Sequence, residues 1–505
     1  ESGNLDFIDE VIPFANKEEG TVYEHLKRAI DFSMKHLGPH NLPAGLYADW
    51  NDCLRLGKDG ESTFVALQFY YAMSILKLFA AHKKDEEYIA FLNQEQEKLG
   101  RIINDLCWNE DRFIRGFTEQ GEVIGKRTDP EANMWLNPQS WSVISGLASP
   151  QQADAAMNNV YEKLNTEYGA ILMDPPYHTH AFDGALAVIY NPGSKENAGI
   201  FSQTQGWLIL AEALMGHGDR AFMYFTENAP SAQNDRAEIR KLEPYCHGQF
   251  TEGKHSPHFG RSHVHWLTGT ASTVMVGCVE GILGMRPDFY GLRIAPSIPK
   301  DWDKFTVEKD FRGKHLHIEV LNPDHKESGY TKLVVNGEEL ADNYRKCGSR
   351  IFMTSTVTGE GIKEFGECLR GKTSVLAGPS GVGKSSLINV LFPKADMEIG
   401  EISEKIKRGK HTTRHSELFS LGDGVYLMDT PGFTSLGLPE MEKEELREYY
   451  PEFEEYKNTC RFLGCVHIHE PQCSVKIALE EGKIPKGRYD NYKQFFDEIS
   501  SKRKY

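Results

Sequence analysis

The segment GPSGVGKSS at residues 378–386 has the residue types and spacing of a loop that binds nucleotide phosphates. It fits GxxxxGK[ST], follows the apolar run TSVLA and precedes the helical pattern SSLINVLF, so the expected context is strand, loop, helix. Glycines let backbone N–H groups surround phosphates, the lysine reaches the outer phosphates, and the serine after it holds Mg²⁺. The residues expected to bind nucleotide are Gly378, Pro379, Ser380, Gly381, Val382, Gly383, Lys384, Ser385 and Ser386.

A second phosphate-binding pattern follows downstream. VYLMDTPGF at 425–433 reads as an apolar strand that ends in DxxG. Asp429 is expected to reach Mg²⁺ directly or through water, and the Gly432 amide is expected to face the γ-phosphate. Between the two patterns, GKHTTRH offers Thr412 and Thr413 as switch-type ligands. Loop, threonines and DTPG in this order indicate a GTPase rather than a kinase.

A compact cluster of soft ligands lies near the C-terminus. Cys460, Cys465, His467 and Cys473 follow C-x4-C-x-H-x5-C within fourteen residues. Three thiolates and one imidazole suit a closed tetrahedral Zn²⁺ site. The alternative is a set of buried cysteines beside a surface histidine, and His469 is a rival ligand, a supporting group or a surface residue.

Residues 344–505 resemble the C-terminal two-thirds of the RsgA/YjeQ family, the circularly permuted GTPases that depend on the small ribosomal subunit. The segments TSTVTGEGI (354–362), GPSGVGKSS, RGKHTTRH, DTPGF and CRFLGCVHIHEPQC match in the family's order. The resemblance implies GTP hydrolysis, binding to the small subunit and its rRNA, and a role late in subunit maturation. Phe433 stands where other GTPases place a catalytic Gln, so another group must position water. His411 or His415 would do this, unless both are surface or RNA-contacting residues.

Part of this family's pattern is not found in the sequence. The family has an N-terminal OB-fold and a guanine-reading NKxD motif, and no NKxD occurs here. The match begins near Tyr344, in YRKCGSRIF. The upstream residues are therefore not expected to be the N-terminus of such a GTPase.

Residues from about 20 to 340 resemble the C-terminal half of glycoside hydrolase family 94, the cellobiose and chitobiose phosphorylase group. The segments that carry the resemblance are ADWNDCLRLG, NPQSWSVISGLAS, NPGSKENAGIF, EPYCHGQF, WLTGTAS and EGILGMRPDFYGLRIAPSIPKDW. The resemblance implies an (α/α)₆ barrel followed by a small β-domain. It also implies cleavage of a β-linked disaccharide by inorganic phosphate, with inversion and release of a sugar 1-phosphate.

The chemistry of an inverting phosphorylase explains these residues. One carboxylic acid protonates the leaving oxygen, and phosphate is itself the nucleophile, so no carboxylate base is required. The resemblance assigns the acid to Asp52, whose alternative role is that of a loop-capping carboxylate. Trp50 is expected to stack on a sugar and Asp49 to shape the loop. The other sugar- or phosphate-binding residues that it implies are Lys195, Glu196, Glu243, Tyr245, Gln249, Thr268 and Gly269.

One position departs from this family. Gln203 stands seven residues after the Glu of KEN, where the family commonly has a phosphate-binding His. Glutamine donates a hydrogen bond but adds no positive charge. The phosphate affinity, or the assignment of this site, is therefore open.

The elements that must position these groups differ along the chain. Residues 20–285 show helical periodicity between loops, for example over 62–82 and 207–225, and residues 288–340 turn to strand patterns. We expect a partial barrel over 1–285, a β-domain over 286–343, part of a permuted α/β GTPase domain over 344–440 and a helical zinc-binding domain over 441–505. The barrel is expected to be incomplete, because the family's opening helices are not matched.

Net charge and cysteine content indicate the cellular compartment and the class of partner. Residues 1–343 carry a net charge of about −17 and residues 344–505 about +1, so the first part is unlike a nucleic-acid binder. Nine cysteines, scattered except for the last three, suit a reducing compartment. The acidic start ESGNLDFIDEVIPF has no signal pattern, and no apolar run reaches membrane-spanning length. These features predict a cytoplasmic chain without a membrane partner.

Three functional hypotheses remain from the sequence. The chain is a fusion, joined near residues 341–348, of a GTP-hydrolysing ribosome-maturation part and a phosphorylase part. Alternatively, disaccharide phosphorolysis is its main activity, or it is a non-functional chimera in which both sites are incomplete.

Overall fold

The computed structural model divides the chain into two compact units, residues 1–329 and 330–505, which are described separately. The residues that it describes are 2–16, 18–289, 291–329, 333–335, 338–339, 344–345, 347–356, 359–377, 384–391, 417–420, 425–429 and 441–501.

The first three α-helices of the first unit pack together, and they are α1 (Val22–Lys35), α2 (Thr63–His82) and α3 (Glu86–Cys107). The helix expected from periodicity over 62–82 is confirmed as α2, which begins where the Ser62 side chain accepts a hydrogen bond from the Val65 N–H. The Asp85 carboxylate caps α3 in the same way, through the Tyr88 N–H. Buried side chains of all three helices, among them Leu67 and Leu92, share one apolar core.

Helix α2 is the one helix among the described residues that is long and apolar enough to cross a membrane by length and composition. This differs from the expectation that no such segment exists. Phe64, Leu67, Met73 and Leu76 of this helix are buried within the unit. A core helix that packs against both of its neighbours has the same composition.

The next helices are α4 (Leu136–Ile144), α5 (Pro150–Asn159), α6 (Ser202–Leu214) and α7 (Gly218–Asn228), then α8 (Ala237–Arg240) and α9 (Thr270–Val276). The periodic segment 207–225 is two helices, not one. Gly216, at φ 83°, closes α6, where its N–H donates to the Ala213 carbonyl and the His217 N–H to the Glu212 carbonyl. This left-handed closure depends on a single glycine and is not visible in the apolar period.

Helices α6 and α9 approach each other closely. A Cβ on Gly206 would lie 2.3 Å from the Thr273 carbonyl carbon, so only glycine permits this spacing. The Thr273 hydroxyl donates to the Gln203 carbonyl at 3.0 Å. The first turn of α6 is therefore held beside the start of α9.

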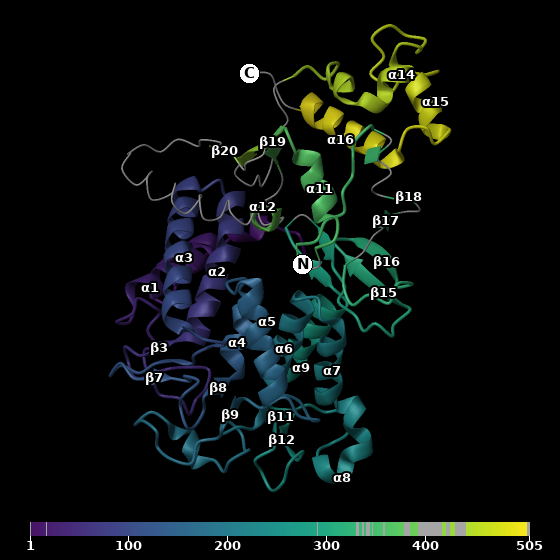
Figure 1. The fold of residues 1–505 in the computed structure, drawn as a ribbon. Coiled ribbons are helices and arrows are strands. Elements are labelled where there is room, and N and C mark those ends of the chain that lie inside the picture. Colours follow the sequence, from purple (N-terminus) through teal and green to yellow (C-terminus); the bar gives the residue numbers. More distant parts are fainter. Residues whose placement is uncertain are drawn as a thin grey trace. The chain divides into compact units, whose positions relative to one another are not determined.

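Short ribbons gather at one end of these helices (Figure 1). They include a sheet of β3 (Glu61–Ser62), β6 (Gly116–Phe117) and β7 (Val123–Ile124), the pair β8 (Met134–Trp135) and β9 (Met173–Asp174), and a sheet of β10 (Ile200–Phe201), β11 (Gly248–Thr251) and β12 (Ser262–His265). Loops that enter and leave these ribbons carry the predicted sugar-binding residues.

The remaining strands of the unit are short pairs and one longer hairpin. The pairs are β1 (Val11–Pro13) with β2 (Glu19–Thr21), β4 (Trp108–Asn109) with β5 (Arg112–Phe113), and β13 (Met285–Pro287) with β14 (Leu292–Ile294). The hairpin joins β15 (Lys304–Phe311) and β16 (Lys314–Leu321) in register Lys304↔Leu321 to Phe311↔Lys314. The strand expected at KHLHIEVLN is β16.

The second unit contains a three-stranded sheet and a helical end. The pair β17 (Val334–Val335) and β18 (Glu338–Glu339) comes first, then α11 (Ile362–Leu369). Strand β19 (Thr373–Leu376) runs parallel to β21 (Tyr426–Asp429), which pairs antiparallel with β20 (Glu417–Ser420), and α12 (Lys384–Leu391) follows β19 along the chain. The end comprises α14 (Glu454–Lys457), α15 (Ser474–Glu480) and α16 (Lys486–Ser501), around a core that includes Phe453, Val475 and Tyr492.

Candidate functional site

A buried arginine, Arg115, holds the loop ADWND in place through ionic and hydrogen-bond contacts. Arg115 is fully buried and pairs with the Asp49 carboxylate, and its guanidinium donates to Asn51 Oδ1 at 2.9 Å and to Ser62 Oγ at 2.7 Å. Asp49 Oδ1 also accepts from the Asn51 N–H at 2.9 Å, which closes a tight turn. Asp49 therefore faces inward, and the loop presents Asp52 outward, where its side chain is exposed.

We expect Arg115→Met to destabilise the first unit strongly, because it leaves the buried Asp49 charge without its partner. Removing one member of a buried pair typically costs about 3–5 kcal/mol. Denaturant unfolding measures this free energy. The double variant Arg115→Met, Asp49→Asn should recover part of the loss, and equal stability of single and double variants would contradict the pairing.

Trp50 connects this loop to the first turn of α6. Its indole N–H donates to Gln203 Oε1 at 3.3 Å, and its ring packs edge-on against Phe201, with centroids 4.9 Å apart. Since an indole nitrogen only donates, the carbonyl end of Gln203 faces Trp50. The amide nitrogen points toward Gly269, and a Cβ added there would lie 4.0 Å from it.

The residue after Asp52 is tied to a buried carboxylate. The Cys53 N–H donates to Glu196 Oε2 at 2.9 Å, and Glu196 is buried. Burial raises the pKa of Glu196, and the nearby Asp52 carboxylate adds to this. Lys195 donates to the Tyr190 hydroxyl at 3.1 Å, a bond that raises the pKa of the lysine. The residues that flank Asp52 in the sequence are therefore held in place, Trp50 by Gln203 and Cys53 by Glu196.

The remaining predicted residues lie on two further loops. Thr268 and Thr270 share a hydroxyl–hydroxyl hydrogen bond of 2.6 Å beside Gly269. Glu243 accepts from the Trp266 indole N–H at 2.6 Å, and Gln249 lies in β11. Neither Glu243 nor the exposed Tyr245 has a hydrogen bond or ion pair to Asp52 among the described contacts. The described contacts therefore join Cys53 to Glu196 and Trp50 to Gln203, and Gly269 lies near Gln203, whereas they do not join Glu243 or Tyr245 to Asp52.

Three residues near this site were not singled out from the sequence. They are Arg115, Tyr190 and Trp266. Arg115 is the lone charge in the buried segment FIRGF, and that was its available signal. Trp266 stood inside a quoted motif but had no role assigned.

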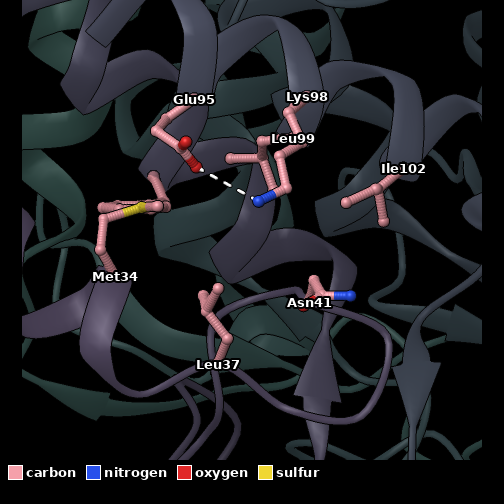
Figure 2. A pocket seen from close by; sticks show the side chains of 8 residues that line it. Met34, Leu37, Asn41, Glu95, Lys98, Leu99 and Ile102 are labelled. Atoms are coloured by element: carbon pink, nitrogen blue, oxygen red, sulfur yellow. Dashed lines mark ion pairs between the residues drawn. The ribbon is translucent and has the colours of Figure 1, made fainter. Parts of the chain in front are cut away.

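The small crevice in Figure 2 is not part of this site. It lies between α1, α2 and α3, where Met34 and Leu37 face an ion pair of 3.5 Å between Glu95 and Lys98. Its volume of about 10 Å³ is near the minimum for one water molecule. A sugar or nucleotide does not fit there.

In the second unit, the two strands that lead into the phosphate-binding patterns end at one edge of the sheet. Strands β19 and β21 are parallel, with Leu376 opposite Asp429, so both strands end at the same edge. Lys384 opens α12. Residues Gly378, Pro379, Ser380, Gly381, Val382, Gly383, Thr412, Thr413 and Gly432 lie outside the described residues, as do His411, His415 and Phe433. The side chains of Ser385, Ser386 and Asp429 are also outside the description.

The four predicted metal ligands lie together. One ligand atom from each of Cys460, Cys465, His467 and Cys473 lies within 4.8 Å of every other. His467 Nδ1 is 3.6 Å from Cys460 Sγ and 3.3 Å from Cys473 Sγ, whereas its Nε2 is buried without a partner among the described residues. His469 is exposed and outside the cluster.

This donor set fits a tetrahedral Zn²⁺ ion bound through Nδ1. Burial lowers the pKa of His467 to about 4, so the imidazole is neutral and able to ligate at neutral pH. Burial raises the pKa of Cys465 to about 12, so binding a metal there must displace a thiol proton. The ligand loop is held by Tyr489 and Tyr492, whose hydroxyls donate to the carbonyls of His467 and Val466.

Two family models match the chain. Residues 1–284 match the glycosyl hydrolase 94 superfamily, catalytic domain, and residues 325–439 match RsgA GTPase. An N,N'-diacetylchitobiose phosphorylase from Vibrio furnissii is 37% identical over 356 residues, which is 69% of this chain and 44% of that protein.

Two small ribosomal subunit biogenesis GTPases named RsgA match the other part. The Agathobacter rectalis protein is 57% identical over 168 residues, 33% of this chain and 56% of that protein. The protein from Geobacillus sp. is 48% identical over 202 residues, 40% of this chain and 67% of that protein. The chain spans less than half the length of the phosphorylase and between half and two-thirds of the GTPases. The chain therefore belongs to the glycosyl hydrolase 94 superfamily through its N-terminal part and to the RsgA GTPase family through its C-terminal part, as a fusion of the two.

Proposed function

We propose that the first unit cleaves a β-linked disaccharide with inorganic phosphate and inverts the anomeric centre. The observation that carries this proposal is the pair of anchors around Asp52, Trp50 to Gln203 and Cys53 to Glu196. These contacts fix the residues on either side of Asp52, whose carboxyl group is exposed. The membership in the phosphorylase family supports the same reaction class.

The proposed chemistry assigns one role to each group. Asp52 gives its proton to the glycosidic oxygen while that oxygen leaves the anomeric carbon, and a phosphate oxygen forms the new bond to the opposite face of that carbon. The products are an α-sugar 1-phosphate and a free sugar. Thr268, Gly269 and the Gln203 amide nitrogen hold the phosphate, while Lys195 and Glu196 hold sugar hydroxyls. With Gln203 in this position, the phosphate is bound without an imidazolium charge.

The experiment is to incubate the full chain with phosphate and either cellobiose or N,N'-diacetylchitobiose. Formation of a sugar 1-phosphate, followed by phosphorus NMR, supports the proposal. We expect slow turnover, because Gln203 binds phosphate without a positive charge. No product from either sugar would favour the hypothesis of a non-functional chimera.

We also propose that the second unit binds GTP·Mg²⁺ and assists maturation of the small ribosomal subunit through rRNA contacts. The parallel register that sets Leu376 opposite Asp429 supports it, because phosphate loops and Mg²⁺-binding carboxylates meet at the carboxyl ends of such strands. The similarity to the RsgA GTPases supports the partner. We further propose a cytoplasmic location for both parts, because nine scattered cysteines suit a reducing compartment.

We expect nucleotide binding to be weak and to discriminate poorly between guanine and adenine. The guanine-reading Asp of an NKxD motif is not found in the sequence, and each charge-assisted hydrogen bond that it would make contributes about 1.5–3 kcal/mol. The preference for GTP over ATP should be below about tenfold. Calorimetric titration of both nucleotides with Mg²⁺ measures this, and Lys384→Ala should abolish binding of either. Strong, selective GTP binding would mean that another residue reads the base.

A further inference from the structure

The loop between the first two predicted zinc ligands carries an exposed apolar tip. Cys460 and Cys465 both belong to the metal cluster, so residues 461–464 form a loop that is anchored at both ends. Leu463 is fully exposed, and Phe462 is 45% exposed. Isolated apolar side chains are ordinary on a protein surface, whereas two neighbours at the tip of an anchored loop indicate a contact surface. None of the roles assigned above uses either side chain.

Contacts within the second unit hold this tip in one conformation. Gly464 has a φ of 78°, which closes the turn, and the Cys465 N–H donates to the Phe462 carbonyl at 3.3 Å. The Arg461 guanidinium donates to Gln472 Oε1 at 2.6 Å and lies 5.6 Å from the centre of the Phe462 ring. A loop that is fixed before binding loses little conformational freedom when a partner binds.

A further exposed ring belongs to a segment that is tied to the same loop. Tyr449 ends the short 3₁₀ helix η6 (Leu446–Tyr449) and is 63% exposed. Within this helix, the Arg447 guanidinium donates to the Cys465 carbonyl at 2.8 Å. The loop and η6 are therefore held together. Exposed aromatic side chains on fixed elements are typical anchors of protein–protein interfaces.

The charge of this region does not suit a nucleic acid. Residues 441–501 contain nine Lys and Arg against thirteen Asp and Glu, a net charge of −4, and the three basic residues that follow bring it only to −1. Lys457 already pairs with Glu448 and Glu454, and Arg447 pairs with Glu448 at 3.1 Å. Nucleic acids are bound by Lys and Arg side chains that are free to neutralise phosphates, so this surface favours another partner.

An acidic surface with an apolar tip is complementary to a basic protein that has an apolar pocket. Negative charge attracts such a partner and orients it, while the apolar side chains that become buried supply the affinity. Proteins that bind RNA carry clusters of Lys and Arg, and the ribosomal proteins of the small subunit belong to this class. Leu463 has no ring with which to stack on a base, so it fits an apolar pocket better than it fits single-stranded RNA.

We propose that Phe462 and Leu463 dock into an apolar pocket of a basic protein of the small ribosomal subunit. This docking rests on the proposed function of the second unit, from which the small subunit comes as the partner. The contact at the tip is made by protein and not by rRNA. Cys460 and Cys465 hold the two ends of the loop, and the loop presents the two apolar side chains to the partner.

The test is co-sedimentation of the full chain with purified small ribosomal subunits. We expect Leu463→Asp and Phe462→Ala each to weaken this association at least about tenfold, because each removes an apolar contact from the interface. Ile477→Asp is the matched control, since Ile477 is an exposed apolar residue of α15 in the same region, and it should bind subunits as the unmodified chain does. Both Asp variants should keep one zinc ion per chain, because neither side chain belongs to the metal cluster.

A cross-link identifies the partner. With Leu463 replaced by photoreactive p-benzoylphenylalanine, we expect an adduct with a basic ribosomal protein that survives ribonuclease digestion. An adduct with ribosomal RNA, unchanged binding by Leu463→Asp and Phe462→Ala, or an equal loss in Ile477→Asp overturns the docking while leaving the small subunit in place as the partner. Failure of the unmodified chain to co-sediment with subunits contradicts that partner, and the docking with it.

Discussion

Asp52→Asn lowers the rate of phosphorolysis by at least about a hundredfold in the outcome that we expect. The asparagine side chain has the same shape but no proton to give to the leaving oxygen, and general acids contribute roughly 10²–10⁴ in rate. Because Asp52 is exposed and its carboxylate is not the charge that pairs with Arg115, the substitution should leave folding intact. Release of sugar 1-phosphate from cellobiose or N,N'-diacetylchitobiose gives the rate.

A change of leaving group distinguishes an acid from a merely structural residue. The dinitrophenolate group of a dinitrophenyl β-glucoside leaves without protonation. Asp52→Asn should therefore cleave this substrate with phosphate almost as fast as the unmodified chain does. Asp59→Asn is the matched control, since Asp59 is an exposed carboxylate farther along the same loop. Equal losses on both substrates, or full activity of Asp52→Asn on disaccharides, would rule out the assignment.

The sequence was a good guide where one local pattern decides the structure. The apolar segment over residues 62–82 predicted α2, and the Ser62 side chain caps its start. The apolar period continues through residues 207–225, yet the helix ends within this segment, because Gly216 closes α6 in a left-handed turn. One residue of special conformation outweighs the apolar periodicity.

The candidate sugar site was less accessible to sequence reasoning. Asp52 was identified through a motif. Arg115, which supports this loop through Asp49, is 66 residues away from Asp49 in the sequence. A lone arginine in an apolar ribbon gives no sign of its partner. The contact of Trp266 with Glu243 depends on the fold, which no spacing encodes.

The predicted metal site was only partly predictable from the sequence. Four ligands within fourteen residues were enough to predict their proximity, because a loop of that length keeps its ends close. Spacing alone left His467 and His469 as rivals. The fold separates them, since His467 is buried against two sulfurs and His469 faces outward.

We expect removal of zinc to unfold the C-terminal helical region, 441–501. Its core is small and includes two of the predicted ligands, Cys465 and Cys473. A structural zinc ion contributes on the order of 10 kcal/mol to such a domain. The chain as purified should contain one zinc ion, and a strong chelator should abolish both the metal and the helical circular dichroism of α15 and α16.

Substitution should separate ligands from bystanders. Cys473→Ser and His467→Ala should each lose zinc and the protection of amide hydrogens across this region. His469→Ala and Cys368→Ser should keep one zinc ion per chain, because neither side chain belongs to the four-residue cluster. Retention of zinc in Cys473→Ser, or unchanged helicity after chelation, would show that the region is stabilised by its apolar core alone. The first unit should be unaffected throughout, because its two apolar cores contain no residue of this cluster.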